Sequence, residues 1–312
     1  MKQYKRKLQF VAGSTYSISL PKEWVTEYKL KPQQELDLID SDNGLFISPS
    51  DYSVDTGTLN YCIDGYEDFV SQILISAYYQ GFEDIEFFTK KELTQDVRSS
   101  SRRALSKLPG AEIISEDKKR FVIKVMFDDF NIDIFQLFYR INLLIESSIE
   151  NLVDNFNWDE IRLNEDEIDR LYNLSMKILT ASITNRGILK ASKVEKVSFV
   201  PSLILINKRL ENIGDNLKKI ARLVEEKSIV IKDVKNILLR IFEELNRSII
   251  YLIGKKTKIF PKSSDDLEKE IYMKADSIKD NSVKHLIKWI FRYVVDIQEE
   301  CINVSFYSGI KG

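Results

Sequence analysis

The hydrophobic pattern of the chain changes near residue 130. From Asn131 onward, apolar residues recur every three to four positions, the spacing of one face of an α-helix. Only two of the six prolines, Pro201 and Pro261, lie in this part, and proline interrupts helices. Six helices on short connections predict an all-α bundle of two three-helix repeats over residues 130–312. The helices are expected at 131–154, 163–188, 199–227, 231–254, 264–278 and 281–307.

The first 52 residues show the alternation of short strands instead. Tyr16, Ile18 and Leu20 alternate with small polar residues, and the strand pattern stops at Pro21. We predict a small β domain over residues 1–52. Its strands are expected at 5–13, 16–20, 35–39 and 45–47, with a short helix over 22–30.

Residues 53–129 mix the two patterns. Strand-like stretches at 58–63 and 83–88 each precede a helical stretch, and Gly81 and Pro109 end the two helices. The helices are expected at 66–80 and 93–108, followed by a hairpin of 111–115 with 120–127. The chain is therefore predicted to be an α+β multidomain protein with a mixed α/β middle domain over residues 53–129.

Composition excludes several functional classes. A formal net charge of −2 over 312 residues gives no global sign of a nucleic-acid or membrane partner. Two distant cysteines, Cys62 and Cys301, argue against a disulfide scaffold and fit a reducing cytoplasm. The sequence has no apolar signal core and no stretch able to span a bilayer, so we expect a cytoplasmic protein without membrane insertion. A single histidine, His285, and the lack of nucleotide-binding or nucleophile motifs predict that it is not an enzyme.

Paired carboxylates are the clearest candidate chemistry. Glu165 and Asp169 occupy positions i and i+4 of the second predicted bundle helix, and Glu211 and Asp215 do so in the third. This spacing places each pair on one helical face. If the two helices pack antiparallel, the pairs lie at similar height and can face each other. Four converging carboxylates repel unless a cation lies between them.

The pattern thus suggests a metal site, and oxygen ligands favour a divalent or trivalent ion such as Mg, Mn, Fe or Zn. Gly214 lies between Glu211 and Asp215 and costs about 1 kcal/mol in a helix relative to alanine. It would let a neighbouring backbone or ion approach closely. The alternative is that both pairs lie on solvated helix faces, which is the common role of acidic residues at this spacing.

These same residues carry a resemblance. The segment RLENIGDNLKKIARLVEE, residues 209–226, resembles the PhoU signature, in which Glu-x-x-x-Asp precedes an isoleucine-alanine pair. The segment EDEIDRLYNLSMKIL, residues 165–179, resembles the partner helix, especially of archaeal members. The resemblance covers about 131–307. It implies two three-helix repeats, metal clusters bound by these carboxylates, and restraint of phosphate transport and phosphate-starvation signalling.

The second half departs from the family pattern. Asp296 stands where the last helix should carry its aspartate, but Arg292 occupies the position four residues earlier. Asp266 and Glu270, together with Asp265, match the preceding helix only loosely. We therefore expect Asp266, Glu270 and Asp296 to form a weaker metal site than the first.

The N-terminal segment resembles a different family. Residues 7–50, KLQFVAGSTYSISLPKEWVTEYKLKPQQELDLIDSDNGLFISPS, are similar to the SpoVT/AbrB swapped-hairpin DNA-binding domain in the order of their elements. That family forms intertwined dimers with a basic face on DNA. An archaeal group joins such a domain to a PhoU bundle through a middle segment, and the order of regions here resembles that group.

The resemblance and the local charge together indicate candidate DNA-binding residues. Residues 1–50 contain seven Lys and Arg against six Asp and Glu, so only the N-terminal arm is strongly basic. In a dimer this arm is doubled and offers charge to phosphates. Arginines that could read base edges are scarce, and the alternative is a dimerisation module with a lysine-rich tail. The candidate DNA-binding residues are Lys2, Lys5, Arg6, Lys7, Ser14, Thr15 and Lys22.

A second basic patch lies on the second helix of the middle domain. Arg98, Arg102, Arg103 and Lys107 fall at helical spacing and could meet DNA, phosphate or an acidic partner, although such a run is more often a solvated face. The sequence as a whole predicts a homodimeric, DNA-binding regulator of phosphate homeostasis. Two alternatives stay open: an adaptor that docks on a phosphate transporter or signalling kinase without binding DNA, and a metal-handling protein.

Overall fold

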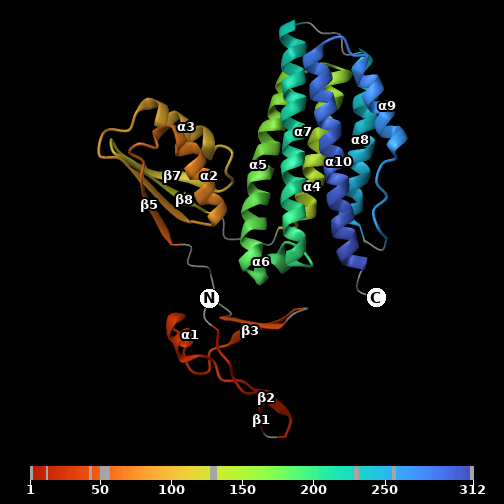
Figure 1. The fold of residues 1–312 in the computed structure, drawn as a ribbon. Coiled ribbons are helices and arrows are strands. Elements are labelled where there is room, and N and C mark those ends of the chain that lie inside the picture. The colour runs from red at the N-terminus through yellow and green to blue at the C-terminus, as the bar shows by residue number, and fades with distance from the viewer. Residues whose placement is uncertain are drawn as a thin grey trace. The chain divides into compact units, whose positions relative to one another are not determined.

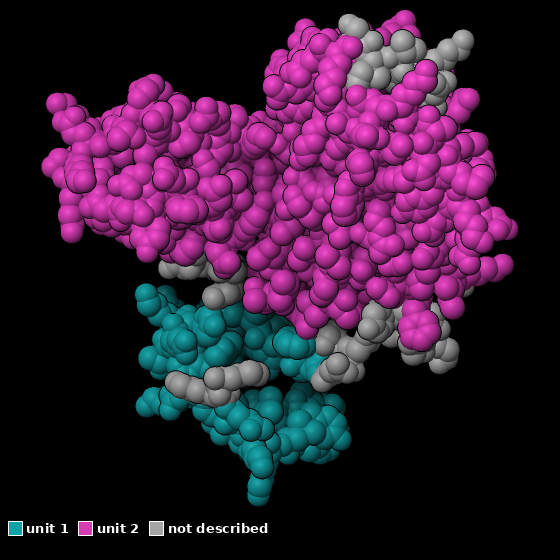
Figure 2. Space-filling view, turned by 45° about the horizontal axis from the view of Figure 1, so that its top comes forward, with its two compact units in different colours: residues 1–55 teal, residues 56–312 magenta. Residues whose placement is uncertain are grey.

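Figure 1 shows the fold in a computed structural model, which describes residues 3–11, 13–41, 44–49, 57–126, 132–227, 232–254 and 258–309. The chain forms two compact units, residues 1–55 and residues 56–312, coloured separately in Figure 2. Each unit is considered by itself below.

The first unit is made of two β hairpins and one short helix. Strand β1 (Gln9–Val11) pairs antiparallel with β2 (Thr15–Ser17), and Gly13 turns the chain between them with a left-handed φ of 77°. Helix α1 (Lys22–Glu27) follows. Strand β3 (Leu36–Ser41) then pairs antiparallel with β4 (Gly44–Pro49), so the unit contains two separate two-stranded sheets.

Few side chains of this first unit are shielded from solvent. Among the side chains described within residues 3–49, only Pro49 is buried. Large apolar side chains lie exposed on both hairpins, and they include Leu8, Phe10, Tyr16, Ile18, Leu38, Leu45 and Phe46. A two-stranded hairpin is marginally stable by itself, so the hairpins need a further surface on which to pack.

The second unit begins with a mixed α/β domain. Its strands are β5 (Thr58–Cys62), β6 (Asp84–Phe88), β7 (Ala111–Glu116) and β8 (Arg120–Val125), in the order β5-β6-β8-β7. Strands β5 and β6 are parallel and are joined by η1 (Glu67–Phe69) and α2 (Val70–Gln80), whereas the other pairs are antiparallel. Helix α3 (Gln95–Leu105) and α2 contribute their apolar faces to the same buried core as the sheet (Figure 1).

The rest of the second unit is a bundle of long helices. They are α4 (Ile134–Val153), α5 (Trp158–Thr184), α7 (Val200–Lys227), α8 (Lys232–Ile253), α9 (Asp265–Asp276) and α10 (Asn281–Gly309). Helices α4, α5 and α7 pack together, α8 to α10 do the same, and one core runs through both sets from Ile134 to Val304. Among the described helices, none is both long and apolar enough to cross a membrane.

The structure confirms an α+β chain with N-terminal β hairpins, a middle mixed sheet with helices and a C-terminal helical region. One predicted helix is divided. The helix expected over 163–188 ends at Thr184, and a short helix α6 (Arg186–Ala191) follows, with η2 (Val197–Phe199) before α7. The cause is local: the Asn185 side chain accepts hydrogen bonds from the backbone of Gly187 and Ile188 and caps a new helix start.

Candidate functional site

Helices α5 and α7 approach each other closely at Gly214. A Cβ atom added at Gly214 would lie 2.9 Å from Cδ1 of Ile168, well inside normal contact. Ile168 lies between Glu165 and Asp169 in the chain, and Gly214 lies between Glu211 and Asp215. The two carboxylate pairs are therefore on facing helices at similar height. The glycine makes room for the side chain of Ile168, where the sequence suggested a backbone or an ion.

Each of the four carboxylates forms an ion pair with a lysine. Glu165 pairs with Lys218 at 2.5 Å, Glu211 with Lys208 at 2.7 Å and Asp215 with Lys219 at 3.3 Å. Asp169 pairs with Lys107. We call these eight residues the carboxylate–lysine cluster. Its formal charges sum to zero.

Burial dominates the electrostatics of the cluster. It raises the pKa of Glu165 and of Glu211, since the charged form loses its hydration. The hydrogen bonds from Lys218 and Lys208 oppose that rise, and the charge of Asp169 adds to it in both cases. Burial lowers the pKa of Lys107, but the hydrogen bond and charge of Asp169 outweigh it, so that the pKa is raised overall.

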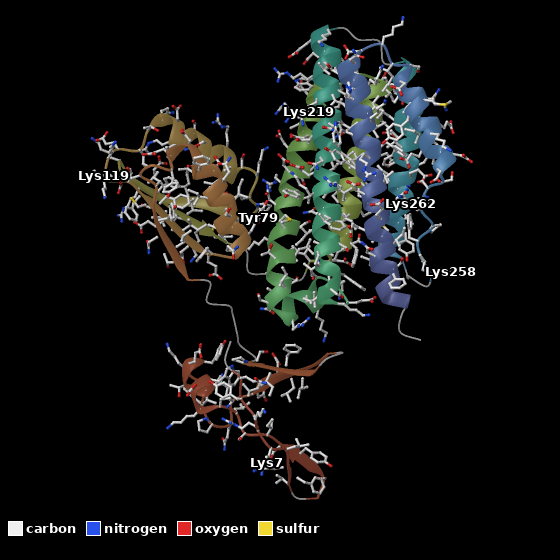
Figure 3. The ribbon with its side chains drawn as sticks, in the orientation of Figure 1. Lys7, Tyr79, Lys119, Lys219, Lys258 and Lys262 are labelled. Atoms are coloured by element: carbon white, nitrogen blue, oxygen red, sulfur yellow. The ribbon has the colours of Figure 1, made fainter. Side chains whose placement is uncertain are left out.

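Lys107 reaches the cluster from the α/β domain, just after α3. The domain lies against α5 through several polar contacts. The Tyr79 hydroxyl donates to Oδ1 of Asn173 at 2.5 Å, and Nδ2 of Asn173 donates to the carbonyl of Lys107 at 3.0 Å. Figure 3 shows Tyr79 on the side of the α/β domain that faces α5. The buried Lys177 of α5 places its ammonium 4.8 Å from the centre of the Tyr78 ring.

The residues present do not fit a metal ion in this arrangement. A cation between the carboxylates would meet lysine ammonium groups that already contact their oxygens. Within the described residues, no three acidic, histidine or cysteine side chains converge as a metal centre requires. The sequence-based prediction of metal ligation by Glu165, Asp169, Glu211 and Asp215 omitted these lysines.

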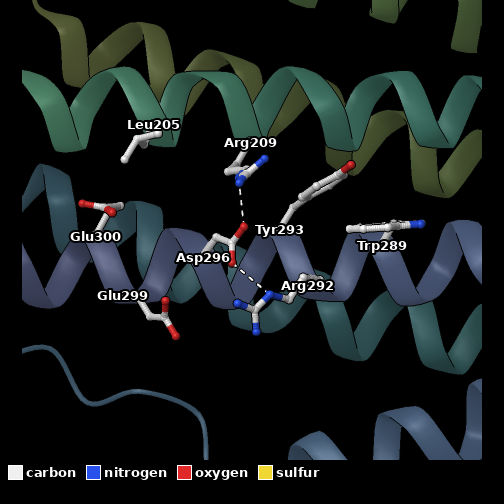
Figure 4. A pocket seen from close by; sticks show the side chains of 8 residues that line it. All are labelled: Leu205, Arg209, Trp289, Arg292, Tyr293, Asp296, Glu299 and Glu300. Atoms are coloured by element: carbon white, nitrogen blue, oxygen red, sulfur yellow. Dashed lines mark ion pairs between the residues drawn. The ribbon is translucent and has the colours of Figure 1, made fainter.

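The residues proposed for a second metal site have separate basic partners. Asp296 of α10 lies between Arg209 and Arg292, at 2.9 and 3.1 Å, in a pocket of about 380 Å³ (Figure 4). On α9, Glu270 pairs with Lys274 at 2.5 Å, and Asp266 lies at the surface 4.0 Å from Lys269.

A buried acid of this half was missed by sequence reasoning. Glu244 of α8 accepts hydrogen bonds from Arg247 at 2.5 Å, from the Ser263 hydroxyl at 2.6 Å and from Gln298 at 3.1 Å. The position of Glu244 on the apolar stripe of α8 is the sequence signal that could have indicated its burial.

The predicted basic patch is divided among different partners. Arg98 and Arg102 both pair with Glu116 of β7, and Lys107 pairs with Asp169 of α5. Arg103 is exposed on α3. These four side chains therefore do not present one free cationic surface.

The proposed DNA-binding residues of the first unit lie at its surface, except that Lys2 falls outside the described residues. Lys5, Arg6 and Lys7 precede β1 and are exposed, and Figure 3 shows Lys7 near the β1–β2 hairpin. The remaining three are also exposed: Ser14 and Thr15 at the β1–β2 turn and Lys22 at the start of α1.

Sequence reasoning did not include the lysines in the carboxylate site, although it had placed Lys107 in the candidate basic patch. Lys208, Lys218 and Lys219 lie in or beside the segment that carries Glu211 and Asp215, so i, i+3 and i, i+4 spacing could have indicated some of them. Lys107 is 62 positions before Asp169 in another domain, and no local signal connects the two.

Comparison with known protein families gives two matches in this chain. Residues 9–55 match the family described as antidote-toxin recognition MazE, bacterial antitoxin, and residues 141–224 match the PhoU domain. No curated protein and no solved structure matches the chain. The PhoU match covers α5 and most of α7, with every member of the carboxylate–lysine cluster except Lys107, and it ends before α8. Members of the PhoU family can bind metals, and both domain types are typically non-catalytic regulators. The PhoU domain suggests phosphate regulation, and the first domain suggests DNA binding. The chain thus combines a MazE/AbrB-like antitoxin-type domain at its N-terminus with a PhoU domain in its C-terminal region.

Proposed function

We propose that this protein is a homodimeric intracellular regulator of phosphate uptake, which binds DNA through its N-terminal domain and relays phosphate status through its PhoU bundle. The proposal assigns residues 1–52 to dimerisation and DNA binding, 53–129 to the middle domain and 130–312 to the bundle. The observation that carries it is the combination of the two matched domains in one chain.

Exposed apolar side chains support a dimer through the first unit. Phe10 and Tyr16 lie opposite each other on the β1–β2 hairpin with their ring centres 5.0 Å apart and the rings tilted, yet 59% of Phe10 and 65% of Tyr16 remain accessible. Leu38 and Leu45 of the other hairpin are also exposed. Contiguous exposed apolar surface marks an interaction site. A second copy in a swapped-hairpin arrangement would cover both hairpins, as the AbrB-like resemblance implies.

The basic arm supports contact with DNA phosphates. Lys5, Arg6 and Lys7 are adjacent and exposed, and none of them has an acidic partner among the described residues. Arg6 lies 5.7 Å from the centre of the Tyr4 ring, and the Tyr4 hydroxyl donates to Glu23 at 2.7 Å. Through these contacts Tyr4 connects the basic arm to helix α1. Dimerisation would place two such arms on one duplex.

Fluorescence anisotropy with labelled duplex DNA tests this proposal. The Lys5→Ala/Arg6→Ala/Lys7→Ala variant should bind at least roughly tenfold more weakly than wild type at low salt, because it removes phosphate contacts from both protomers. The matched control is Lys90→Ala/Lys91→Ala/Lys119→Ala, which removes three exposed lysines from the α/β domain. Equal binding by the two variants would contradict the role of the arm. If wild type shows no salt-dependent DNA binding, the DNA-binding function is excluded and the adaptor function is the one that stands.

The adaptor function has its own structural support. Trp289 and Tyr293 of α10 stack 5.9 Å apart beside Arg209 and Arg292, and 55% of Trp289 is exposed (Figure 4). Trp, Tyr and Arg are the residues that most often dominate protein interfaces. This surface suits a docking partner such as a phosphate transporter or signalling protein. A Trp289→Ala variant that loses such a partner but keeps DNA binding would show that the two functions coexist.

A further inference from the structure

Three of the four carboxylates in the carboxylate–lysine cluster, Glu165, Asp169 and Glu211, are more buried than those of surface ion pairs usually are. Only 6% of the Glu165 side chain and 12% of the Asp169 side chain are accessible. Taking a carboxylate out of water costs several kcal/mol unless a partner compensates it. Glu165, Asp169 and Glu211 therefore need nearby positive charge for the bundle to fold, from a bound cation or from the chain itself, whereas 37% of the Asp215 side chain is accessible to solvent.

The chain supplies those charges from two different domains. Lys208, Lys218 and Lys219 belong to α7, and Lys218 crosses from α7 to Glu165 on α5. Lys107 belongs to the α/β domain. Its position is fixed by the contact of Asn173 with its carbonyl at 3.0 Å, and by Arg170 donating to the carbonyl of Ser106 at 3.3 Å. The backbone that carries Lys107 is thus attached to the same helix as Asp169.

We propose that these lysines are built-in counterions that take the place of metal ions in this PhoU bundle, and that Lys107 ties the neutrality of the cluster to docking of the α/β domain. A docked domain leaves the cluster neutral. An undocked domain leaves Asp169 without its cation, next to a buried Glu165. A divalent cation at the cluster and the docked α/β domain are therefore alternatives that exclude each other at Asp169.

The first test uses the purified full-length protein and measures metal content and thermal unfolding, with chelator or with millimolar Mn²⁺. Wild type should purify without stoichiometric metal, and neither addition should move its Tm. The Lys107→Met/Lys218→Met variant should unfold several degrees lower, bind Mn²⁺ and recover Tm when Mn²⁺ is added. The control Lys235→Met removes the partner of Asp154, a pair in which half of the aspartate side chain is accessible, and should gain no Mn²⁺ response.

Two results would overturn the proposal. One is stoichiometric metal in wild type whose removal lowers Tm. The other is a folded double variant that neither loses stability nor gains Mn²⁺ binding. If the double variant does not fold, the Lys107→Met variant alone is compared with Lys235→Met in the same way.

Hydrogen exchange tests the docking part of the proposal separately. In Lys107→Met, amide exchange of α2 should become faster than in wild type, because α2 packs on α5 in the docked domain. It should stay at the wild-type rate in Lys235→Met. Unchanged exchange of α2 in Lys107→Met would show that Lys107 does not hold the domain. Neither measurement depends on DNA binding, so their outcome is independent of the proposed regulatory function.

Discussion

The two compact units of this protein differ in how far they bury their apolar side chains. In the second unit a continuous apolar core runs through the bundle, and even buried carboxylates have internal partners, such as Lys218 for Glu165. In the first unit, the apolar side chains of both hairpins remain exposed. The exposed apolar surface of the hairpins marks an interaction site, whereas the buried carboxylates of the second unit have their partners within that unit. Changes at the exposed hairpin residues of the first unit should therefore alter self-association, and changes in the buried part of the second unit should alter stability.

The largest effect is expected from a charge in the exposed apolar surface of the first unit. Leu38 is 61% exposed within one chain, so Leu38→Lys should leave the second unit folded. If a second copy covers Leu38, each burial contributes about 1.5–3 kcal/mol and symmetry doubles it. The dimer dissociation constant should then rise by more than roughly a hundredfold, as measured by analytical ultracentrifugation.

The control for this prediction comes from the second unit. Ile114 of β7 is 56% exposed, and Ile114→Lys changes the same kind of residue outside the proposed dimer surface. Its dissociation constant should equal that of wild type. Dimerisation through the hairpins would be contradicted if wild type sediments as a monomer. It would also be contradicted if the two variants change the dissociation constant equally.

A smaller effect, on stability alone, is expected at the contact of α5 with α7. Gly214→Leu adds a side chain where Ile168 already approaches, and overpacking of this kind costs about 1–3 kcal/mol of unfolding free energy. Gly214→Ala adds only one carbon, which requires a small shift of the terminal methyl group of Ile168, and it regains about 1 kcal/mol of helix propensity. Chemical denaturation should therefore rank the leucine variant well below the alanine variant. Equal stability of the two would mean that the helices are not in close contact there.

The smallest effect concerns Glu244 and depends on pH. Burial raises the pKa of Glu244, but Arg247, Ser263 and Gln298 outweigh it, so the folded-state pKa lies below the usual value of 4.5. Its stabilising contribution is therefore present above the unfolded pKa and is lost as the pH falls through the folded one. Glu244→Gln should cost about 1 kcal/mol at neutral pH by weakening charged hydrogen bonds.

That cost should shrink as the pH falls below about 4.5, which thermal unfolding over a pH series can measure. Glu243→Gln is the control, because Glu243 is the adjacent and largely exposed residue of α8. A cost for Glu244→Gln that is constant with pH would contradict the hydrogen-bonded carboxylate.

Local patterns in the sequence predicted most of the fold. The spacing of apolar residues and the positions of proline and glycine located the long helices to within a few residues, because each helix carries its own apolar stripe and capping residues. The division at Asn185 was missed, since an asparagine within a helical pattern gives only a weak local signal.

The candidate site was harder to predict because its charges come from distant segments. The i, i+4 spacing placed Glu165 and Asp169 on one face, and Gly214 indicated a close approach. Neither signal could show that Lys107 of another domain reaches Asp169, since only the packing of the α/β domain on α5 brings the two together. Local charge also could not reveal that Glu116 engages Arg98 and Arg102.

Selection of bound sequences from a pool of random duplex DNA tests the central claim most directly. Full-length wild type should enrich a site with two-fold symmetry, because a symmetric dimer reads two half-sites. Leu38→Lys and the Lys5→Ala/Arg6→Ala/Lys7→Ala variant should both lose the enrichment. The claim would be contradicted by the absence of any enriched sequence with wild type at low salt, or by full enrichment with the Leu38→Lys variant.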